Sequence, residues 1–358
     1  MGIEQRIREL RRKLQMEELD AMLISNADNR RYLSGFTGSS GYLVVTQKEL
    51  ILLTDFRYTE QASNQSPEFR IERVGGNYAW LPNIAQELGI KKMGFESQDL
   101  TFATHALFKD NLNESNINER PPSFIPTNGI VETIRILKDG HELELLTHAI
   151  GLSDNAINKI APYIEAGTRE SEIAWSLEKD MRDGGAESLA FDIIVGSGSN
   201  GALPHHRAGE KVIQDGDAVV IDMGARYEGY NSDLTRTVIV GKLNETFSEV
   251  YEIVLNAQLS AIENVREGMT GGEVDAISRN IITEAGYGDA FGHSLGHGVG
   301  LAVHENPRIS PNSIDVLQNG MVFTIEPGIY INGWGGVRIE DVVVLENGRA
   351  RVISNAEK

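Results

Sequence analysis

The sequence predicts a two-domain protein of mixed α/β (α+β) structure. Its 358 residues exceed the roughly 250–300 residues that a single hydrophobic core usually serves. Apolar runs of strand length occur together with longer segments of helical periodicity. Two adjacent prolines, Pro121 and Pro122, and then Pro126 break both kinds of pattern. We therefore expect a first domain over residues 1–126 and a second over residues 127–358.

In the first domain, one helix is expected to precede several strands. The segment from Ile3 to Leu19 is charged and amphipathic, as a surface helix is. Four apolar runs are interpreted as strands, over residues 21–25, 41–46, 50–54 and 92–96. The string Asn29-Arg-Arg-Tyr-Leu-Ser-Gly-Phe36 has one purely structural interpretation, as a connection from a strand to a turn. These elements together predict an α/β domain.

In the second domain, the first helix is expected to begin near Gly140. Apolar residues at helical spacing predict four helices, over residues 141–164, 169–182, 247–266 and 273–284. Two capping-box strings support the starts of the last two, Thr246-Phe-Ser-Glu249 and Thr270-Gly-Gly-Glu273. Gly286 is expected to end the fourth helix.

Two aspartates occupy the strands of a predicted hairpin. Residues 218–224 form one apolar strand that contains Asp222 near its end, and residues 233–240, which begin at Asp233, form its return. A turn centred on Tyr227 and Glu228 would set Asp222 opposite Asp233. Directly opposed side chains lie roughly 4.5–5.5 Å apart, where two carboxylates repel unless a cation lies between them. The pair therefore indicates a cation site.

Two glutamates repeat this arrangement on a second predicted hairpin. Glu326 ends an apolar run, Glu340 lies in another, and the two positions mirror each other about Gly333. Four carboxylates on two hairpins can hold a pair of cations about 3.5–4 Å apart. His297 would be a fifth ligand, and oxygen ligands with one imidazole favour Mn²⁺, Co²⁺ or Zn²⁺.

His297 lies in a glycine-rich stretch, residues 291–307, that is typical of a site loop and not of a helix. Each candidate also has a purely structural interpretation. A single aspartate in a strand is most often a turn or edge residue, and His293, His297 and His304 could be ordinary loop histidines. His205 and His206 could form an exposed turn after Pro204. The joint pattern, and no single member, favours a two-metal hydrolase.

The order and local context of these residues closely resemble the pita-bread metallopeptidases. The resemblance rests on the strings Ile-Asp222-Met-Gly, Ser-Asp233-Leu-Thr-Arg-Thr, Gly-His-Ser-Leu-Gly-His297-Gly-Val-Gly, Thr-Ile-Glu326-Pro-Gly and Val-Arg-Ile-Glu340-Asp. Within that superfamily the sequence is similar to the prolidase and aminopeptidase P branch, which the Asn29 to Phe36 string also resembles. The resemblance covers nearly the whole chain. It implies an N-terminal creatinase-type domain followed by a C-terminal pita-bread domain.

The resemblance also assigns roles to individual residues. It implies two divalent metal ions held by five ligands: Asp222, Asp233, His297, Glu326 and Glu340. Glu326 would in addition relay a proton to the leaving nitrogen. His293 and His304 match active-site histidines of the family, and His205 matches one that holds substrate. Arg338, two residues before Glu340 and on the same strand face, can orient Glu340 or a substrate carboxylate.

The implied activity is hydrolysis of the Xaa-Pro bond, with a Xaa-Pro dipeptidase (prolidase) ahead of a Xaa-Pro aminopeptidase that acts on longer peptides. The N-terminal domain argues against methionine aminopeptidases, and the intact carboxylate set argues against the metal-independent creatinases. A non-catalytic peptide-binding relative is the alternative from another class. Phe191, Tyr230 and Tyr330 could form an apolar wall for proline, although plain packing is the favoured explanation for each of them.

Composition restricts the partners. A net charge of −19 argues against nucleic acids and anionic membranes, and the lack of cysteine excludes disulfides and thiolate metal sites. Residues 1–19 do not resemble a signal peptide, and no apolar run reaches the length of a membrane span. We expect a cytoplasmic protein that binds a proline-containing di- or oligopeptide, and the family resemblance implies a homodimer.

Overall fold

The computed structural model describes residues 2–114, 121–242 and 245–358. The chain forms two compact units, Met1–Arg135 and Ile136–Lys358. The predicted boundary near residue 126 falls inside the first unit, in a strand that completes its sheet. Prolines mark this segment because it is an edge strand, where a missing backbone N–H is tolerated.

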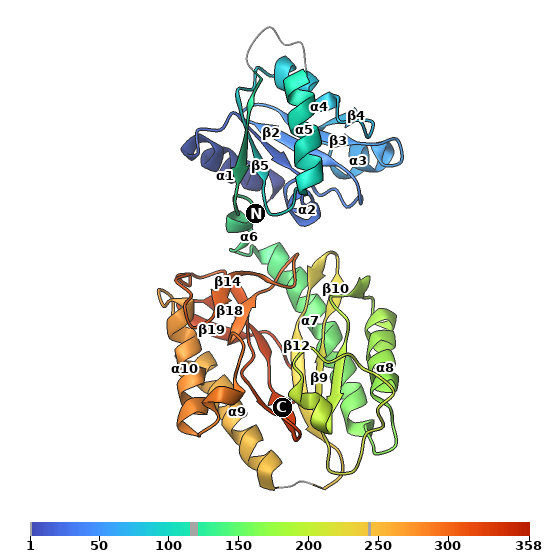
Figure 1. The fold of residues 1–358 in the computed structure, drawn as a ribbon, viewed down its shortest axis with the longest axis vertical. Helices are drawn as coiled ribbons and strands as arrows, with labels where there is room; N and C mark the ends of the chain where they lie inside the picture. Colours follow the sequence, from blue (N-terminus) through green and yellow to red (C-terminus); the bar gives the residue numbers. More distant parts are fainter. Residues whose placement is uncertain (1, 115–120, 243–244) are drawn as a thin grey trace. The chain divides into compact units, whose positions relative to one another are not determined.

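The first unit is one six-stranded sheet with helices packed around it (Figure 1). The strand order is β4-β3-β2-β1-β5-β6, and β1 runs antiparallel to β2 but parallel to β5. The strands are β1 Ala21–Ile24, β2 Tyr42–Thr46, β3 Leu50–Thr54, β4 Arg70–Arg73, β5 Lys92–Glu96 and β6 Ser123–Thr127. The helices are α1 Ile3–Met16, α2 Ala27–Ser34, α3 Thr59–Gln65, α4 Trp80–Glu87, α5 Phe102–Glu114 and α6 Glu132–Arg135.

The four strands predicted in this unit are confirmed, whereas β4 and β6 were not predicted. Both lie at the edges of the sheet and bury little of their surface, so neither carries a continuous apolar run. The purely structural interpretation of the Asn29–Phe36 string as a strand-to-turn connection is wrong, since most of the string lies in α2. The Asn26 side chain caps that helix by accepting from the Asn29 N–H, and Gly35, at φ +76°, ends it.

The second unit pairs helices with sheets in two halves (Figure 1). In one half, α7 Gly140–Ile160 and α8 Glu170–Asp183 cover a sheet of order β12-β9-β8. In the other, α9 Glu245–Asn264 and α10 Gly271–Glu284 pack against a sheet of order β14-β13-β15-β18-β19. The strands are β7 Ser188–Leu189, β8 Ile194–Ser197, β9 Ala218–Met223, β10 Ala225–Tyr227, β11 Tyr230–Asn231, β12 Leu234–Ile239, β13 Gly296–Gly298, β14 Glu305–Ile309, β15 Val322–Ile325, β16 Gly328–Ile331, β17 Gly335–Arg338, β18 Asp341–Glu346 and β19 Arg349–Val352.

The four predicted helices of this unit are present, with ends shifted by a few residues. The Thr270 capping box is confirmed, and so is Gly286, at φ +88°, just beyond the end of α10. The Thr246 capping box is wrong, because α9 begins at Glu245 and Thr246 lies within it. The same residue spacing also occurs inside helices, where it caps nothing. Within the described parts of the chain, no helix is both long and apolar enough to span a bilayer.

Candidate metal centre

The first hairpin carries Asp222 and Asp233 in a register that differs from the prediction. Asp222, in β9, lies opposite Thr235 of β12, and Asp233 lies just before that strand. The central turn residues are Glu228 and Gly229, with φ of 43° and 79°, as a two-residue type I′ turn requires. The turn therefore lies one residue later than predicted, which shifts every cross-strand pair by two.

The second hairpin has the predicted register. Ile325 pairs with Asp341 on one side of the glutamates, and Gly328 pairs with Arg338 on the other. Both pairs are symmetric about Gly333, whose φ is +80°, so Glu326 and Glu340 occupy mirrored positions as expected.

His297 is held in a short strand, and not in the expected loop. It lies in β13 between β14 and β15, with a glycine on each side. A Cβ atom on Gly296 would come within 2.0 Å of the Thr324 carbonyl oxygen, and one on Gly298 within 2.1 Å of the Asn306 carbonyl oxygen. Only glycine permits this close packing, which brings the imidazole toward the two hairpins.

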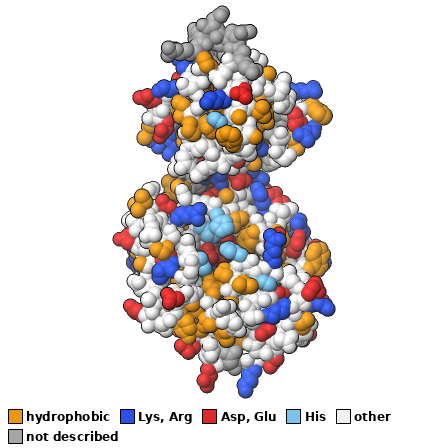
Figure 2. Space-filling model, viewed as in Figure 1, with side chains coloured by type: hydrophobic (Ala, Val, Ile, Leu, Met, Phe, Trp, Pro, Cys, Tyr) orange, Lys and Arg blue, Asp and Glu red, His pale blue; other side chains and the backbone are white. Residues whose placement is uncertain are grey.

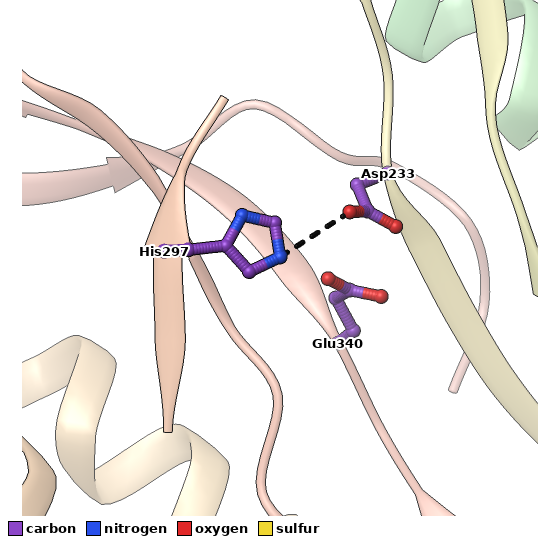
Figure 3. A group of neighbouring side chains, drawn as sticks. All are labelled: Asp233, His297 and Glu340. Carbon is purple, nitrogen blue, oxygen red and sulfur yellow. Dashed lines mark ion pairs between the residues drawn. The ribbon is translucent and has the colours of Figure 1, made fainter. Parts of the chain in front are cut away.

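The two hairpins and β13 meet at one buried cluster. Ligand atoms of Asp233, His297 and Glu340 all lie within 4.8 Å of one another, and Figure 3 shows the imidazole pointing toward both carboxylates. His297 Nε2 is 3.5 Å from Asp233 Oδ2 and 3.3 Å from Glu326 Oε1. Asp222 and Glu326 line the same cavity, of about 430 Å³. The structure therefore brings together all five residues proposed as ligands.

Two carboxylate oxygens in this cluster fit a cation. Asp222 Oδ1 and Glu340 Oε1 are buried and have no hydrogen-bond partner among the described residues. A buried anionic oxygen without a partner is costly, and coordination of a cation removes that cost. The donor set of carboxylates with one imidazole is the type that binds divalent ions of intermediate hardness.

The pKa shifts in the cluster also indicate a cation site. Burial raises the pKa of Asp233 and of Glu340 well above the usual range, and the neighbouring carboxylates raise them further. Burial would also raise the pKa of Glu326, but its hydrogen bond and attraction to His297 outweigh this and lower it to about 2. The cluster thus crowds negative charge around one imidazole, which is unfavourable unless positive charge is supplied.

The three accessory histidines line the same cavity. His205, His293 and His304 all contribute to its wall, and Figure 2 shows histidines gathered on this face of the second unit. The His304 ring centroid lies 4.1 Å from that of His297. Burial lowers the pKa of His293, so its imidazole is neutral near neutral pH. The cavity therefore combines hydrogen-bonding histidines with the carboxylate cluster.

Tyr330 and Thr235 connect Arg338 to other residues of the site, and the sequence did not reveal either connection. Arg338 donates to Tyr330 Oη (2.8 Å), Asp222 Oδ2 (2.6 Å) and Thr235 Oγ1 (3.0 Å). The Tyr330 oxygen also lies 3.0 Å from His293 Nε2, and Thr235 donates to Glu340 Oε2 at 2.8 Å. Arg338 therefore bonds Asp222 directly and reaches Glu340 through Thr235.

The three proposed wall residues have different surroundings. Phe191 lines the cavity. Tyr330 makes a polar contact, because its hydroxyl accepts a hydrogen bond from Arg338. The Tyr230 hydroxyl donates to Glu142 at 2.9 Å, and this side chain is not among those that line the cavity.

His206 has a fixed partner, unlike the exposed turn considered for it. Its Nε2 lies 2.8 Å from Oε2 of Glu170, a fully buried residue in α8. Burial tends to raise the pKa of Glu170, but hydrogen bonds from Ser197, His206 and Asn200 outweigh it and lower the pKa. This contact anchors the segment that carries His205. It could not be predicted because Glu170 is distant in sequence.

Comparisons with known proteins agree with this geometry. Residues 144–347 match the sequence model of metallopeptidase family M24, and residues 6–137 match the creatinase/prolidase N-terminal domain. The chain is 40% identical to the Xaa-Pro dipeptidase of Pyrococcus furiosus over 99% of both chains. A solved Xaa-Pro dipeptidase from Bacillus anthracis is 42% identical, with a TM-score of 0.95 and coverage of 100% of this chain and 99% of that one. A solved X-Pro aminopeptidase from Thermotoga maritima is 38% identical, with a TM-score of 0.89 and coverage of 98% of each chain.

Proposed function

Because the chain belongs to metallopeptidase family M24, we propose that it is a metal-dependent exopeptidase that hydrolyses the Xaa-Pro bond of dipeptides. The observation that carries this proposal is the buried cluster with two unpartnered carboxylate oxygens, on Asp222 and Glu340. The names of the relatives from P. furiosus and B. anthracis support the choice of substrate.

The proposed cofactor is a pair of divalent ions, Mn²⁺ ahead of Co²⁺ or Zn²⁺. The residues that would hold them are Asp222, Asp233, His297, Glu326 and Glu340. When bound, such ions polarise a peptide carbonyl and activate water at neutral pH.

The remaining work of the reaction falls to side chains of the cavity. Glu326, which lines it, is proposed to carry the proton to the leaving nitrogen. His304 is proposed to donate to the oxygen that gains negative charge during attack, His293 to contact the reacting peptide, and His205 to hold the substrate. Arg338 keeps Asp222 in place through their 2.6 Å hydrogen bond.

The size and lining of the cavity support a short substrate. Its volume of about 430 Å³ lies near the lower end of the range for small-molecule sites, about 300–1,000 Å³. A bond to proline is a tertiary amide without an N–H, so the site can select it by shape and apolar contact. Phe191, on the cavity wall, is the side chain proposed to make that contact.

A Xaa-Pro aminopeptidase is the second candidate, favoured by the similarity to the T. maritima protein. A non-catalytic peptide-binding protein is the third possibility, although all five proposed ligands are present in one cluster. The homodimer and the cytoplasmic location expected from the sequence remain parts of this proposal. Light scattering of the purified protein tests the first, and fractionation of the source cells tests the second.

Hydrolysis of Ala-Pro beside Ala-Pro-Ala tests the proposed function. The protein is stripped with a chelator and assayed with and without added Mn²⁺. Metal-dependent cleavage of Ala-Pro alone is the expected result. Cleavage of the tripeptide would identify an aminopeptidase instead, and metal binding without turnover of either peptide would favour a binding protein.

Replacing Tyr330 with Phe tests the hydrogen-bond network. The variant loses the hydroxyl that contacts both His293 and Arg338. Loss of a residue that orients a metal ligand typically costs about 10–100-fold, so we expect kcat/KM for the preferred Xaa-Pro peptide to fall by at least about 10-fold. Replacing the exposed Tyr163 with Phe is the matched control and should leave kcat/KM unchanged. Equal kcat/KM values for the two variants would show that the Tyr330 hydroxyl does not contribute to hydrolysis.

A further inference from the structure

The backbone of residues 291–295, called here the His293 loop, is held by two side chains of helix α10 in addition to a backbone hydrogen bond from the Glu326 N–H to the Leu295 carbonyl oxygen (2.8 Å). Arg279, in α10, donates to the carbonyl oxygens of Phe291 (2.9 Å) and His293 (2.8 Å). Asp275, one turn earlier, accepts the backbone N–H of Leu295 at 3.0 Å. Two side chains of one helix thus satisfy three backbone groups of the loop.

The two side chains also hold each other. Asp275 accepts from Arg279 Nε at 2.6 Å and from Arg279 Nη2 at 2.9 Å, a two-point contact between a planar guanidinium and a carboxylate. The Asp275 side chain is 1% exposed and that of Arg279 is 24% exposed. Both project from a regular helix whose start is fixed by the Thr270 capping box. This makes a rigid support behind the loop.

Ring contacts extend the support to the imidazole of His293. The Arg279 guanidinium lies over the Phe291 ring, 4.2 Å from its centroid. The Phe291 ring in turn contacts the His293 ring edge-on, with centroids 5.1 Å apart and planes at 90°. His293 then reaches the network of Tyr330 at 3.0 Å. A continuous series of contacts therefore runs from α10 to the candidate metal centre.

We propose that Arg279, held by Asp275, is a positioning residue that fixes the imidazole of His293 in the candidate metal centre. This inference rests on the proposed function, in which His293 contacts the reacting peptide. Arg279 itself lies behind the loop and is not one of the side chains that line the cavity. Its loss leaves two loop carbonyls without this donor and removes the guanidinium from the buried Asp275 carboxylate, which keeps only the Leu295 N–H of the contacts described above, so the loop must move to find other partners. A displacement of about 1 Å at a reacting group can cost about 100-fold in rate.

A double-mutant cycle tests the path through His293. Arg279→Met is expected to lower kcat on the preferred Xaa-Pro peptide by about 10–100-fold with little change in KM. Arg279→Lys should restore only part of the rate, because an ammonium group cannot reproduce the planar, forked contacts. In a His293→Ala background, Arg279→Met should cost less than about 3-fold, because the group it positions is already absent. An equal loss in both backgrounds would overturn the proposal.

Arg182→Met is the matched control for this cycle. Arg182 forms an i,i+4 ion pair with Glu178 on α8, and both of these side chains are more accessible to solvent than Arg279 and Asp275 are. This control should leave kcat within about 2-fold of the unmodified protein, as exposed pairs contribute little. If Arg279→Met does not fold, Arg279→Lys and Asp275→Asn take its place in the cycle.

Hydrogen exchange provides a readout that does not need activity. In the metal-free protein, Arg279→Lys and Asp275→Asn should speed exchange of the Leu295 amide by at least about 10-fold, because its acceptor loses its fixed position. The Arg182→Met control should not change it. Unchanged exchange would count against the inference even if Xaa-Pro hydrolysis is confirmed. If the variants exchange the Leu295 amide faster but the unmodified protein does not hydrolyse Xaa-Pro peptides, the role of Arg279 in holding the loop stands. Only the proposed function is then rejected.

Discussion

Replacing Asp233 with Asn should lower kcat/KM for Xaa-Pro hydrolysis by more than about 100-fold, because residues that only orient metal ligands already account for about 10–100-fold. Asp233 lies beside His297 and Glu340 in the buried cluster, and an amide oxygen there is a weaker ligand without negative charge. The measurement is steady-state hydrolysis of the preferred peptide at several Mn²⁺ concentrations, since weaker metal binding would shift the activation curve.

The same variant should fold normally, which separates loss of a ligand from loss of structure. In the metal-free protein, Asp233→Asn removes one of several crowded buried carboxylates, so its thermal midpoint should equal or exceed that of the unmodified chain. Asp183→Asn, which alters an exposed ion pair with Lys179, is the control and should change neither activity nor stability appreciably. Full activity of Asp233→Asn would refute its assignment as a ligand.

Removal of the metal is the second change with a large expected effect. A chelator should abolish peptide hydrolysis and lower the thermal midpoint of the second unit. A ligand at 100 times its dissociation constant stabilises the folded state by about 2.7 kcal/mol. For a domain of this size each kcal/mol corresponds to about 2–4 °C, so we expect a fall of roughly 5–10 °C per ion. Differential scanning calorimetry with and without Mn²⁺ measures it, and identical midpoints would contradict a metal centre.

This stabilisation should depend on pH with a definite sign. The pKa values of Asp233 and Glu340 are raised in the metal-free fold, first by burial and then by neighbouring carboxylates. A carboxyl group whose pKa is raised on folding stabilises the fold below its unfolded pKa, near 4, and loses that contribution as the pH rises through its folded value. The contribution of these two groups to the stability of the metal-free fold should therefore fall as the pH rises above about 4, whereas bound metal requires the deprotonated ligands. The difference between the two midpoints should grow with pH, and a difference independent of pH would oppose this account.

Patterns of apolar residues in the sequence predicted the helices and strands whose side chains are well buried. The number of domains follows from the chain length, and the four strands of the first unit and the four helices of the second follow from apolar runs and hydrophobic periodicity. The edge strands β4 and β6 escaped prediction because half-exposed strands carry no such pattern. The first hairpin was placed two residues out of register, because the sequence did not show which residues would adopt positive φ.

The candidate site was predictable to the extent that its motifs are local. The five proposed ligands were found from carboxylates at strand ends and from a family resemblance. Their supporting contacts were not, because Thr235 with Glu340, Glu170 with His206 and Arg279 with the His293 loop join residues from different elements. Such partners are set by tertiary packing within and between the two halves of the unit, which no short pattern in the sequence reveals.

The glycines on either side of His297 help to position the site because they have no Cβ atom. Gly296 and Gly298 have no chemistry to offer, yet each faces a carbonyl oxygen of a neighbouring strand at a distance that leaves room for a hydrogen and nothing larger. Adding a methyl group to either would wedge the strands apart and draw the imidazole away from the carboxylates. In the motif Gly-His-Gly the histidine specifies the chemistry, and the glycines specify the distance over which it acts.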